Sequence, residues 1–367
     1  MISIDEAKRR LRRFSVDCAA GSPLYSWLSA RAADDDRVAE QLTVGRPENS
    51  VAPLLFAAVQ YLLSWQPDHP LAAYYPTLGG QASTSERTWR EFRNFTVERA
   101  HALRTLIGSR SVQTNEPHRA ALLYPALAMV SSTSGRPVAL VELGCSAGLL
   151  LAFDKYPITY HLSDGSTRTV GPTEGGIELD CSTDGQALPR LDLPVVAERI
   201  GIDRDPIDCD DPEQRRWLES CVWADQPLRL AQLRDALDQI SATPHTILAG
   251  DAVDTLDEAM QLIPAQRAVV VTTSWSMLYL PQRRRLDLVT RLAEFSEHRQ
   301  LWWIDNGPYE DGPSLIDPSH ADLTFALTRQ PTLSSVTWSA GEPRLQILAR
   351  TDAFGRRMTW LNGPSGL

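Results

Sequence analysis

The sequence is poor in the features that indicate a disulfide scaffold, a membrane span or a nucleic-acid surface. Its 367 residues include only five cysteines, with no C-x-x-C pair and no histidine cluster beside them, so no metal site is expected. No run approaches the ~18 apolar residues of a membrane helix. Lysine and arginine number 36 against 46 acids, a net charge of -10. That balance argues against nucleic acid or membrane as partners.

These absences predict a cytoplasmic globular protein. The cysteines are odd in number and scattered along the chain, which suits a reducing compartment. The charged start MISIDEAKRRLRRF lacks the apolar core of a secretory signal. With 43% hydrophobic and 22% charged residues, the chain has the composition of an ordinary soluble protein. Its acidity is compatible with neutral or cationic small molecules as substrates.

Residues 1–134 have a helical pattern with little strand-like alternation, which predicts an N-terminal helical cap domain. Ser3 followed by Glu6 is a capping-box pattern at the first helix. The further helix candidates are Pro23–Ala33, Val51–Trp65, Glu86–Gly108 and His118–Ser131.

The pattern changes after Ser134-Gly135-Arg136-Pro137, and residues 135–367 alternate apolar strands with helices. The strand candidates are Val138–Leu143, Val195–Asp203, Thr246–Gly250, Arg267–Thr273 and Gln300–Asp305. Such alternation predicts an α/β fold with a Rossmann-like, mostly parallel sheet. A polar segment at about 160–194 interrupts it and predicts a hairpin insertion. The runs TLSSVTWSA and PRLQILART predict a closing antiparallel pair.

The strongest local signal is VALVELGCSAGLLLAFD, residues Val138–Asp154. An apolar strand enters a loop with Gly144, Ser146 and Gly148, and a helix is expected from Gly148 to Lys155. Gly144 would allow a sharp turn, and Gly148 would let the helix start pack close to a ligand. The free N–H groups at that helix end would favour an electron-rich group.

Three interpretations of this loop compete. It is a loop of the S-adenosylmethionine (SAM) type with Glu142 at the acidic strand end, a nucleophile elbow with Ser146 as an α/β-hydrolase nucleophile, or a bare tight turn. Asp203 and Asp251 end two later strands and favour the first, because strand-end carboxylates bind ribose hydroxyls and face adenine in such folds. A hydrolase needs a later histidine, and the available ones stand in no recognisable motif.

Many ordered segments resemble one bacterial family. They are SPLYSWL, LLFAAVQYLL, HPLAAYYP, QTNEPHRAALL, VELGCSAGLLLAFDKY, GIDRDPID, WLESCVWADQ, GDAVDTL and SWSMLYLP. On these motifs the chain is similar to the DUF2332 proteins, whose C-terminal part resembles a SAM-dependent methyltransferase. The resemblance implies SAM as cofactor, held by Glu142, Gly144, Ser146, Gly148, Asp203 and Asp251.

One departure from the family pattern concerns catalysis. Thr273-Ser274 stands where the family usually shows His-Ser, which removes an obvious general base. Glu116 becomes the candidate base, with Asn115 and Ser274 orienting the acceptor. The alternative for this loop is structural, with Thr114 or Asn115 as a helix N-cap and Pro117 at the first helical position.

The expected function is therefore a SAM-dependent, methyltransferase-like enzyme acting on a small-molecule or carrier-bound substrate, for example one of natural-product metabolism. A non-methylating elimination or cyclisation on the same scaffold, such as sulfate-eliminating aziridine formation, stays open. So does a catalytically inactive fold that serves as a subunit for a small partner protein.

Overall fold

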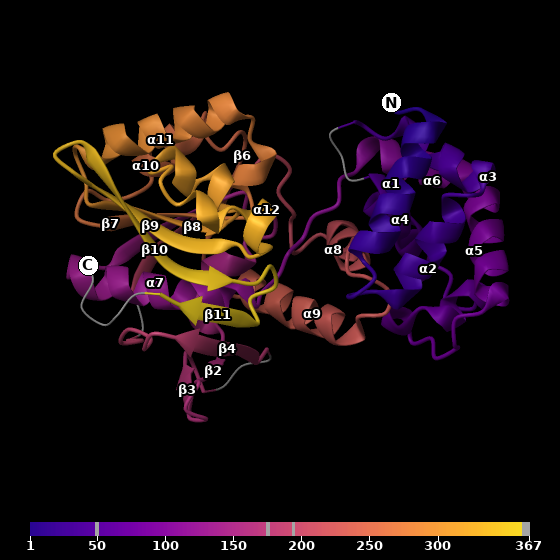
Figure 1. Ribbon diagram of the computed structural model, residues 1–367, viewed down its shortest axis with the longest axis horizontal. Coiled ribbons are helices and arrows are strands. Elements are labelled where there is room, and N and C mark those ends of the chain that lie inside the picture. The colour runs from indigo at the N-terminus through magenta and orange to yellow at the C-terminus, as the bar shows by residue number, and fades with distance from the viewer. Residues whose placement is uncertain (48–50, 174–176, 193–194, 362–367) are drawn as a thin grey trace. The chain divides into compact units, whose positions relative to one another are not determined.

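The computed structural model describes residues 1–47, 51–173, 177–192 and 195–361, and it is a mixed α/β protein (Figure 1). The chain divides into two compact units. A helical unit consists of Met1–Thr114 and Asp210–Arg234, and a sheet unit consists of Asn115–Cys209 and Asp235–Leu367.

This division differs in two places from the boundary expected after residue 134. Helix α7 (Arg119–Ser134) belongs to the sheet unit, where the hydroxyl of Tyr160 donates to the Ala121 carbonyl at 2.8 Å. Helix α8 (Pro212–Ser220) belongs to the helical unit, where the buried Trp217 donates from its indole to the Ser111 carbonyl at 3.0 Å. Periodicity predicts a helix, but it does not tell which core the apolar face will contact.

Helix α4 (Val51–Ser64) forms the centre of the helical unit and is buried on nearly all sides. Aromatic rings continue this core, since Phe56 stacks on Tyr25 at 4.5 Å and on Phe92 at 5.6 Å between centroids. The other elements are α1 Ile4–Asp17, α2 Pro23–Ala32, α3 Asp36–Ala39, α5 Glu86–Glu98, α6 Ala100–Ser109, and the 3-10 turns η1 Glu40–Val44, η2 Pro70–Tyr74 and η3 Pro76–Leu78.

The structure decides two parts of the helical prediction, the N-cap of the first helix and the single helix over Glu86–Gly108. The N-cap of α1 is confirmed, because Ser3 Oγ accepts the Glu6 N–H at 3.2 Å. The single helix expected over Glu86–Gly108 is wrong, because Arg99 leaves helical geometry at φ -99° and ψ 17°. The break allows α5 to pack on η2 while α6 packs on α4 and η1.

The sheet unit holds eleven strands in the order β3-β2-β4-β11-β10-β9-β8-β7-β1-β5-β6. They are β1 Val138–Leu143, β2 Ile158–His161, β3 Thr167–Val170, β4 Leu179–Gly185, β5 Val196–Asp203, β6 Thr246–Ala249, β7 Ala268–Ser274, β8 Leu301–Gly307, β9 Thr332–Ser339, β10 Glu342–Thr351 and β11 Arg357–Trp360. The five strands β8-β7-β1-β5-β6 are parallel, and β9 and β10 continue antiparallel. The five predicted strands and the closing pair are confirmed to within two residues.

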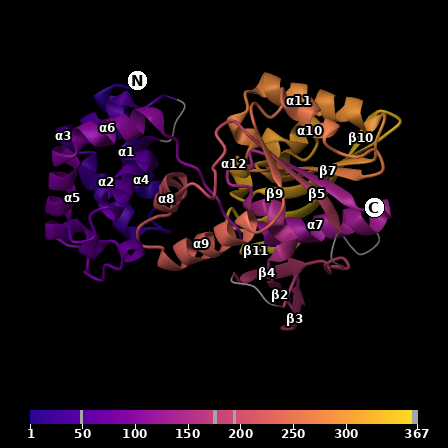
Figure 2. The ribbon, with the colours of Figure 1, turned by 180° about the vertical axis from the view of Figure 1, so that it is seen from behind.

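Helices cover both faces of the parallel strands, as Figures 1 and 2 show. One face carries α10 (Leu256–Gln261) and α11 (Gln282–Ser296), and the other carries α7. All six residues of β1 are consequently buried, as expected for a parallel strand covered on both sides. The remaining elements are α9 Pro227–Ser241, α12 Phe325–Thr328, and the 3-10 turns η4 Leu149–Lys155, η5 Met277–Tyr279, η6 Tyr309–Asp311, η7 Pro313–Leu315 and η8 Ala321–Leu323.

The segment expected as a hairpin insertion is part of the sheet. Strands β2 and β3 form the hairpin, but β4 pairs in parallel with both β2 and β11. The segment therefore extends one edge of the main sheet, a pairing between residues far apart in sequence that local composition does not predict.

Candidate functional site

The order in which successive strands are added to the sheet reverses at β1. Strand β5 lies parallel on one side of β1 and leads outward to β6, whereas β7 lies parallel on the other side and leads outward to β8. The carboxyl ends of β1, β5 and β7 thus meet at a topological switch point. In open α/β sheets, ligands bind outside the carboxyl ends of the strands at such a point.

The loop after β1 folds back onto β5. Gly144, Ser146 and Gly148 have positive φ angles of 76°, 52° and 74°. The amides of Gly144 and Cys145 both donate to the Ile202 carbonyl, at 2.8 and 3.2 Å. The loop therefore follows the neighbouring strand closely before the chain moves away.

The helix expected from Gly148 to Lys155 is a 3-10 segment, η4, with non-helical geometry at Ala152. The amide of Gly148 donates to Cys145 O, and the amide of Leu151 donates to Gly148 O. These amides close tight turns, and a seven-residue kinked segment lacks the aligned dipole of a longer helix. The expectation of a regular helix over Gly148–Lys155 is thus wrong, and the electron-rich group expected at its start stays a prediction.

Asp203 and Asn115 hold the loop from two sides. One carboxylate oxygen of Asp203 accepts the Ser146 N–H at 2.7 Å, and the other accepts the Asp205 N–H at 2.9 Å. The Asn115 amide donates to Ser146 Oγ at 2.7 Å, and its oxygen accepts the Ala147 N–H at 3.4 Å. Three of the residues singled out in the sequence, Asn115, Ser146 and Asp203, are therefore in contact.

Glu142 is a buried acid next to this group. It lies in β1 between Gly201 and Thr272 of the flanking strands. Burial raises its pKa well above the usual range, and the charge of Asp203 adds to this effect while Arg119 opposes it. Glu142 Oε2 has no hydrogen-bond partner among the residues that the structure describes, which leaves it available to a bound polar group.

Asp251 is occupied by arginines. It accepts hydrogen bonds from Arg284, from Arg204 at 3.0 Å and from the Val253 N–H at 3.0 Å. Partial burial would raise its pKa, but the hydrogen bonds from Arg284, Val253 and Arg204 outweigh burial and lower the pKa to about 2. Arg284 also bonds Asp254 at 2.7 Å. The carboxylate is consequently ionised and fixed within a surface charge network.

Thr273 lies in a buried network with β8. Its hydroxyl donates to Asp305 Oδ1 at 2.6 Å and accepts the indole N–H of Trp303 at 2.8 Å. Burial raises the pKa of Asp305 to about 7, with Asp311 adding to the rise and the Thr273 bond and Arg285 opposing it. An acid of this kind exchanges a proton near neutral pH.

Further buried polar atoms accompany Asp305 at the ends of β7 and β8. The sheet register sets Ser274 opposite Asn306, and Asp305 opposite Ser334 on β9. Within the described ranges no hydrogen-bond partner is found for Ser274 Oγ, Trp275 Nε1, Ser276 Oγ, Asp305 Oδ2, Asn306 Nδ2 and Ser334 Oγ. Because unsatisfied buried polar groups are costly, this edge is suited to receive a polar ligand.

Sequence reasoning selected Ser274 here but missed Asp305 and Asn306. The signal was present in LWWIDNG, where two polar residues end an apolar strand that was predicted to be parallel to its neighbour. Neither residue belongs to a motif, whereas the residues of the glycine loop do. The register of β7 against β8 is what brings them beside Ser274.

Glu116, the candidate base, is buried in the sheet unit and 5% exposed. Its Oε1 lies 3.4 Å from Nδ1 of the fully buried His118 and also accepts the His118 N–H at 3.4 Å. Helix α7 begins at Arg119 with His118 as its N-cap. The structural alternative with Thr114 or Asn115 as N-cap is therefore wrong by several residues.

The described residues contain neither a metal-binding cluster nor a membrane-spanning helix. No group of three or more His, Cys, Asp or Glu side chains there could hold a metal ion. No helix within those ranges is long and apolar enough to cross a membrane.

Comparison with known proteins shows the family. The family model described as an uncharacterized protein conserved in bacteria, DUF2332, matches residues 8–360. The chain therefore belongs to the DUF2332 family. No curated protein and no solved structure matches the sequence.

The loop geometry predicts a steric limit at Gly144. A Cβ atom there would lie 2.5 Å from Cβ of Ser276 in a backbone with φ +76°. We expect Gly144→Ala to lower the free energy of unfolding by about 2–5 kcal/mol, combining left-handed strain with overpacking. Gly165→Ala is the control, because Gly165 has φ +82° with nothing within 4 Å of the added atom. It should lose only about 1–2 kcal/mol in the same urea titration, and equal losses would contradict the close contact.

The burial of Asp305 predicts a pH dependence of stability. Its folded pKa of about 7 exceeds the ordinary value of 3.8, so the folded state keeps a proton that the unfolded state releases between these values. Its contribution to stability is present below about pH 4 and is lost as pH rises to about 7. Asp305→Asn lacks this proton, so its stability relative to wild type should rise by up to about 4 kcal/mol across that window. A difference that is constant with pH would contradict this.

Proposed function

We propose that this DUF2332 protein is a SAM-dependent, methyltransferase-like enzyme that acts on a small molecule. The observation that carries the proposal is the loop Gly144–Gly148, held against β5 by Asp203 at the switch point of a parallel sheet. A glycine-containing first loop and an acid at the end of the neighbouring strand are the elements with which doubly wound folds hold a nucleoside. The sheet order around β1 supports a Rossmann-like architecture of this kind.

The residues at the loop fit the ribose and methionine parts of SAM. Each oxygen of Asp203 accepts one backbone N–H, and a carboxylate has about four acceptor sites, so room remains for ribose hydroxyls. Glu142 Oε2 offers a further acceptor among the described residues. Asp251 fits the adenine amino group less well, since Arg284 and Arg204 already occupy it.

Catalysis would depend on alignment and on removal of one proton. When bound, SAM supplies a methyl group on a positively charged sulfur. Ser274 Oγ has no partner among the described residues and would orient the acceptor. Asn115 would act through the loop, because its amide binds Ser146 and Ala147. Glu116 would take the proton, with His118 beside it.

The same groups would serve an elimination or a ring closure, which also needs an amine or hydroxyl to lose a proton. A hydrolase is favoured by one observation, the positive φ of 52° at Ser146 within G-x-S-x-G, which is a feature of a strained nucleophile turn. Against it, Ser146 Oγ already accepts the Asn115 amide at 2.7 Å. The inactive-subunit alternative predicts that no cofactor binds at all.

Isothermal titration with SAM and with S-adenosylhomocysteine tests the proposal. Wild-type protein should bind at least one of them, and Asp203→Asn should bind it about tenfold or more weakly, because a hydrogen bond to a charged group contributes about 1.5–3 kcal/mol. Asp205→Asn is the matched control at a neighbouring exposed acid and should bind normally. Absence of binding at millimolar concentration would refute the proposal, and a fluorophosphonate that labels Ser146 would then establish the hydrolase alternative.

Glu116→Gln tests the catalytic assignment with any acceptor that the wild type methylates. Loss of a general base should lower turnover by about 10²-fold or more while SAM affinity is kept. A variant with near-normal turnover and only a lower melting temperature would show that Glu116 serves the packing of His118 instead.

A further inference from the structure

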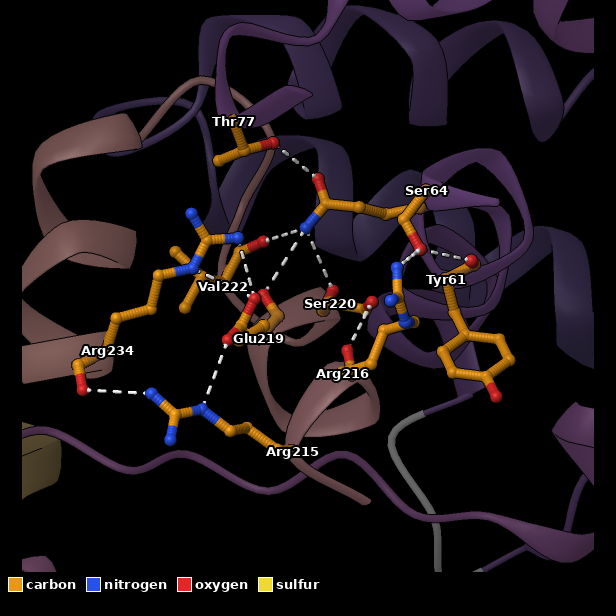
Figure 3. Close-up of polar contacts among 10 residues, drawn as sticks. Tyr61, Ser64, Thr77, Arg215, Arg216, Glu219, Ser220, Val222 and Arg234 are labelled. Carbon is orange, nitrogen blue, oxygen red and sulfur yellow. Dashed lines mark hydrogen bonds and ion pairs between the residues drawn. The ribbon is translucent and has the colours of Figure 1, made fainter. Parts of the chain in front are cut away.

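A cavity of about 270 Å³ lies inside the helical unit, within a group of side chains that the strand-edge site does not use. Helices α4 and α8, the turn η3 and the start of α9 form its walls. Figure 3 shows that Arg216 points toward Ser64, and that Arg234 and Arg215 approach Glu219 from α9 and α8. Polar and charged groups from four elements thus converge on one space.

The frame of the cavity is fixed by a buried amide. Gln60 of α4 is 2% exposed, and its nitrogen donates to the carbonyls of Ser220 at 3.2 Å and Val222 at 2.7 Å. Its oxygen accepts the hydroxyl of Thr77 at 2.9 Å. A fully used amide of this kind holds the end of α8 against α4 and η3, so the cavity is a built feature of the fold.

The charges around the cavity do not cancel. Arg234 donates to Glu219 Oε2 at 2.7 and 3.0 Å, and Arg215 lies 3.6 Å from the other oxygen. Glu219 is therefore shared by two arginines. Of the residues that line the cavity, Arg216 and Arg234 are positive and Glu219 is negative, and no carboxylate among the described residues pairs with Arg216. An excess of positive charge at one cavity contrasts with the net charge of -10 for the whole chain.

Two contacts fix Arg216, but its Nε–H donor makes no hydrogen bond within the described residues. Its guanidinium lies over the Trp65 ring, 4.0 Å from the centroid, and one N–H group reaches Ser64 Oγ at 3.5 Å. Its buried Nε has no hydrogen-bond partner in the described parts of the chain. A guanidinium has five N–H donors in a planar fork that matches a carboxylate. Stacking on an indole leaves the edge of that fork available to an anion.

We propose that this cavity binds a small organic carboxylate, with its anionic group on Arg216 and its apolar part against Leu78 and Leu230. Both leucines line the cavity, and Leu230 is buried. The space suits a body of several carbon atoms beside the anionic group, and the polar side chains of the wall would fix its orientation, as polar groups do in small-molecule sites. This site is separate in its residues from the strand-edge site and does not depend on the proposed methyltransferase function.

Titration of the full chain with hexanoate, with 1-hexanol and with inorganic phosphate tests this proposal by calorimetry. Hexanoate should bind, 1-hexanol should bind at least tenfold more weakly because it lacks the charge, and phosphate should bind more weakly because it lacks the apolar part. Arg216→Gln should weaken hexanoate at least tenfold. Arg216→Lys keeps the charge and should retain an intermediate affinity. Unchanged binding of SAM by these variants would show that the two sites are independent.

Arg283→Gln, at an exposed arginine of the sheet unit, is the matched control and should bind hexanoate like wild type. The proposal is overturned if wild type shows no preference for hexanoate over 1-hexanol, if phosphate binds equally well, or if Arg216→Gln binds hexanoate like wild type while circular dichroism shows a native fold.

Discussion

The Ser146 amide donates to the Asp203 carboxylate at 2.7 Å, and this bond joins the loop after β1 to the end of β5. The positive φ of Ser146 requires a restraint from outside the loop, because Ser146 has a side chain in a conformation that favours glycine. Asp203 supplies that restraint on the backbone, and Asn115 supplies it on the Ser146 hydroxyl. The strand-end groups keep their places around the loop because both contacts are made.

The parallel strands were predicted from the sequence, but their order in the sheet was not. Strands β1, β7 and β8 are buried on both faces and so appear as apolar runs. Strand-end acids such as Asp203 were found for the same reason, since a polar residue at the end of such a run is conspicuous. Local sequence patterns were less informative for a segment whose residues suit both an α-helix and a 3-10 helix. The run after Gly148 has helix-forming leucines, yet it forms a 3-10 segment with non-helical geometry at Ala152.

The tertiary pairings could not be predicted in this way. Helix α7 is apolar on nearly all sides, and its packing against β4, β7, β8 and β9, with the hydrogen bond from Tyr160, places it on the sheet. Likewise the register of β7 against β8 decides that Asp305 meets Thr273. Asp305 belongs to no motif with a chemical meaning of its own. The missing part of the site therefore depends on long-range contacts that a single sequence does not contain.

The buried acids at the strand ends, Glu142 and Asp305, affect which charge a ligand there would carry. Burial disfavours the charged form of Glu142 and Asp305, and a cation beside either acid would favour it. Binding and ionisation are then linked, since a ligand that lowers an acid's pKa binds more tightly as the acid ionises. A sulfonium or an amine would supply such a cation, whereas an anion would add to the repulsion. The carboxylate proposed for the helical unit would face a guanidinium, that of Arg216, so the two proposed sites would select opposite charges.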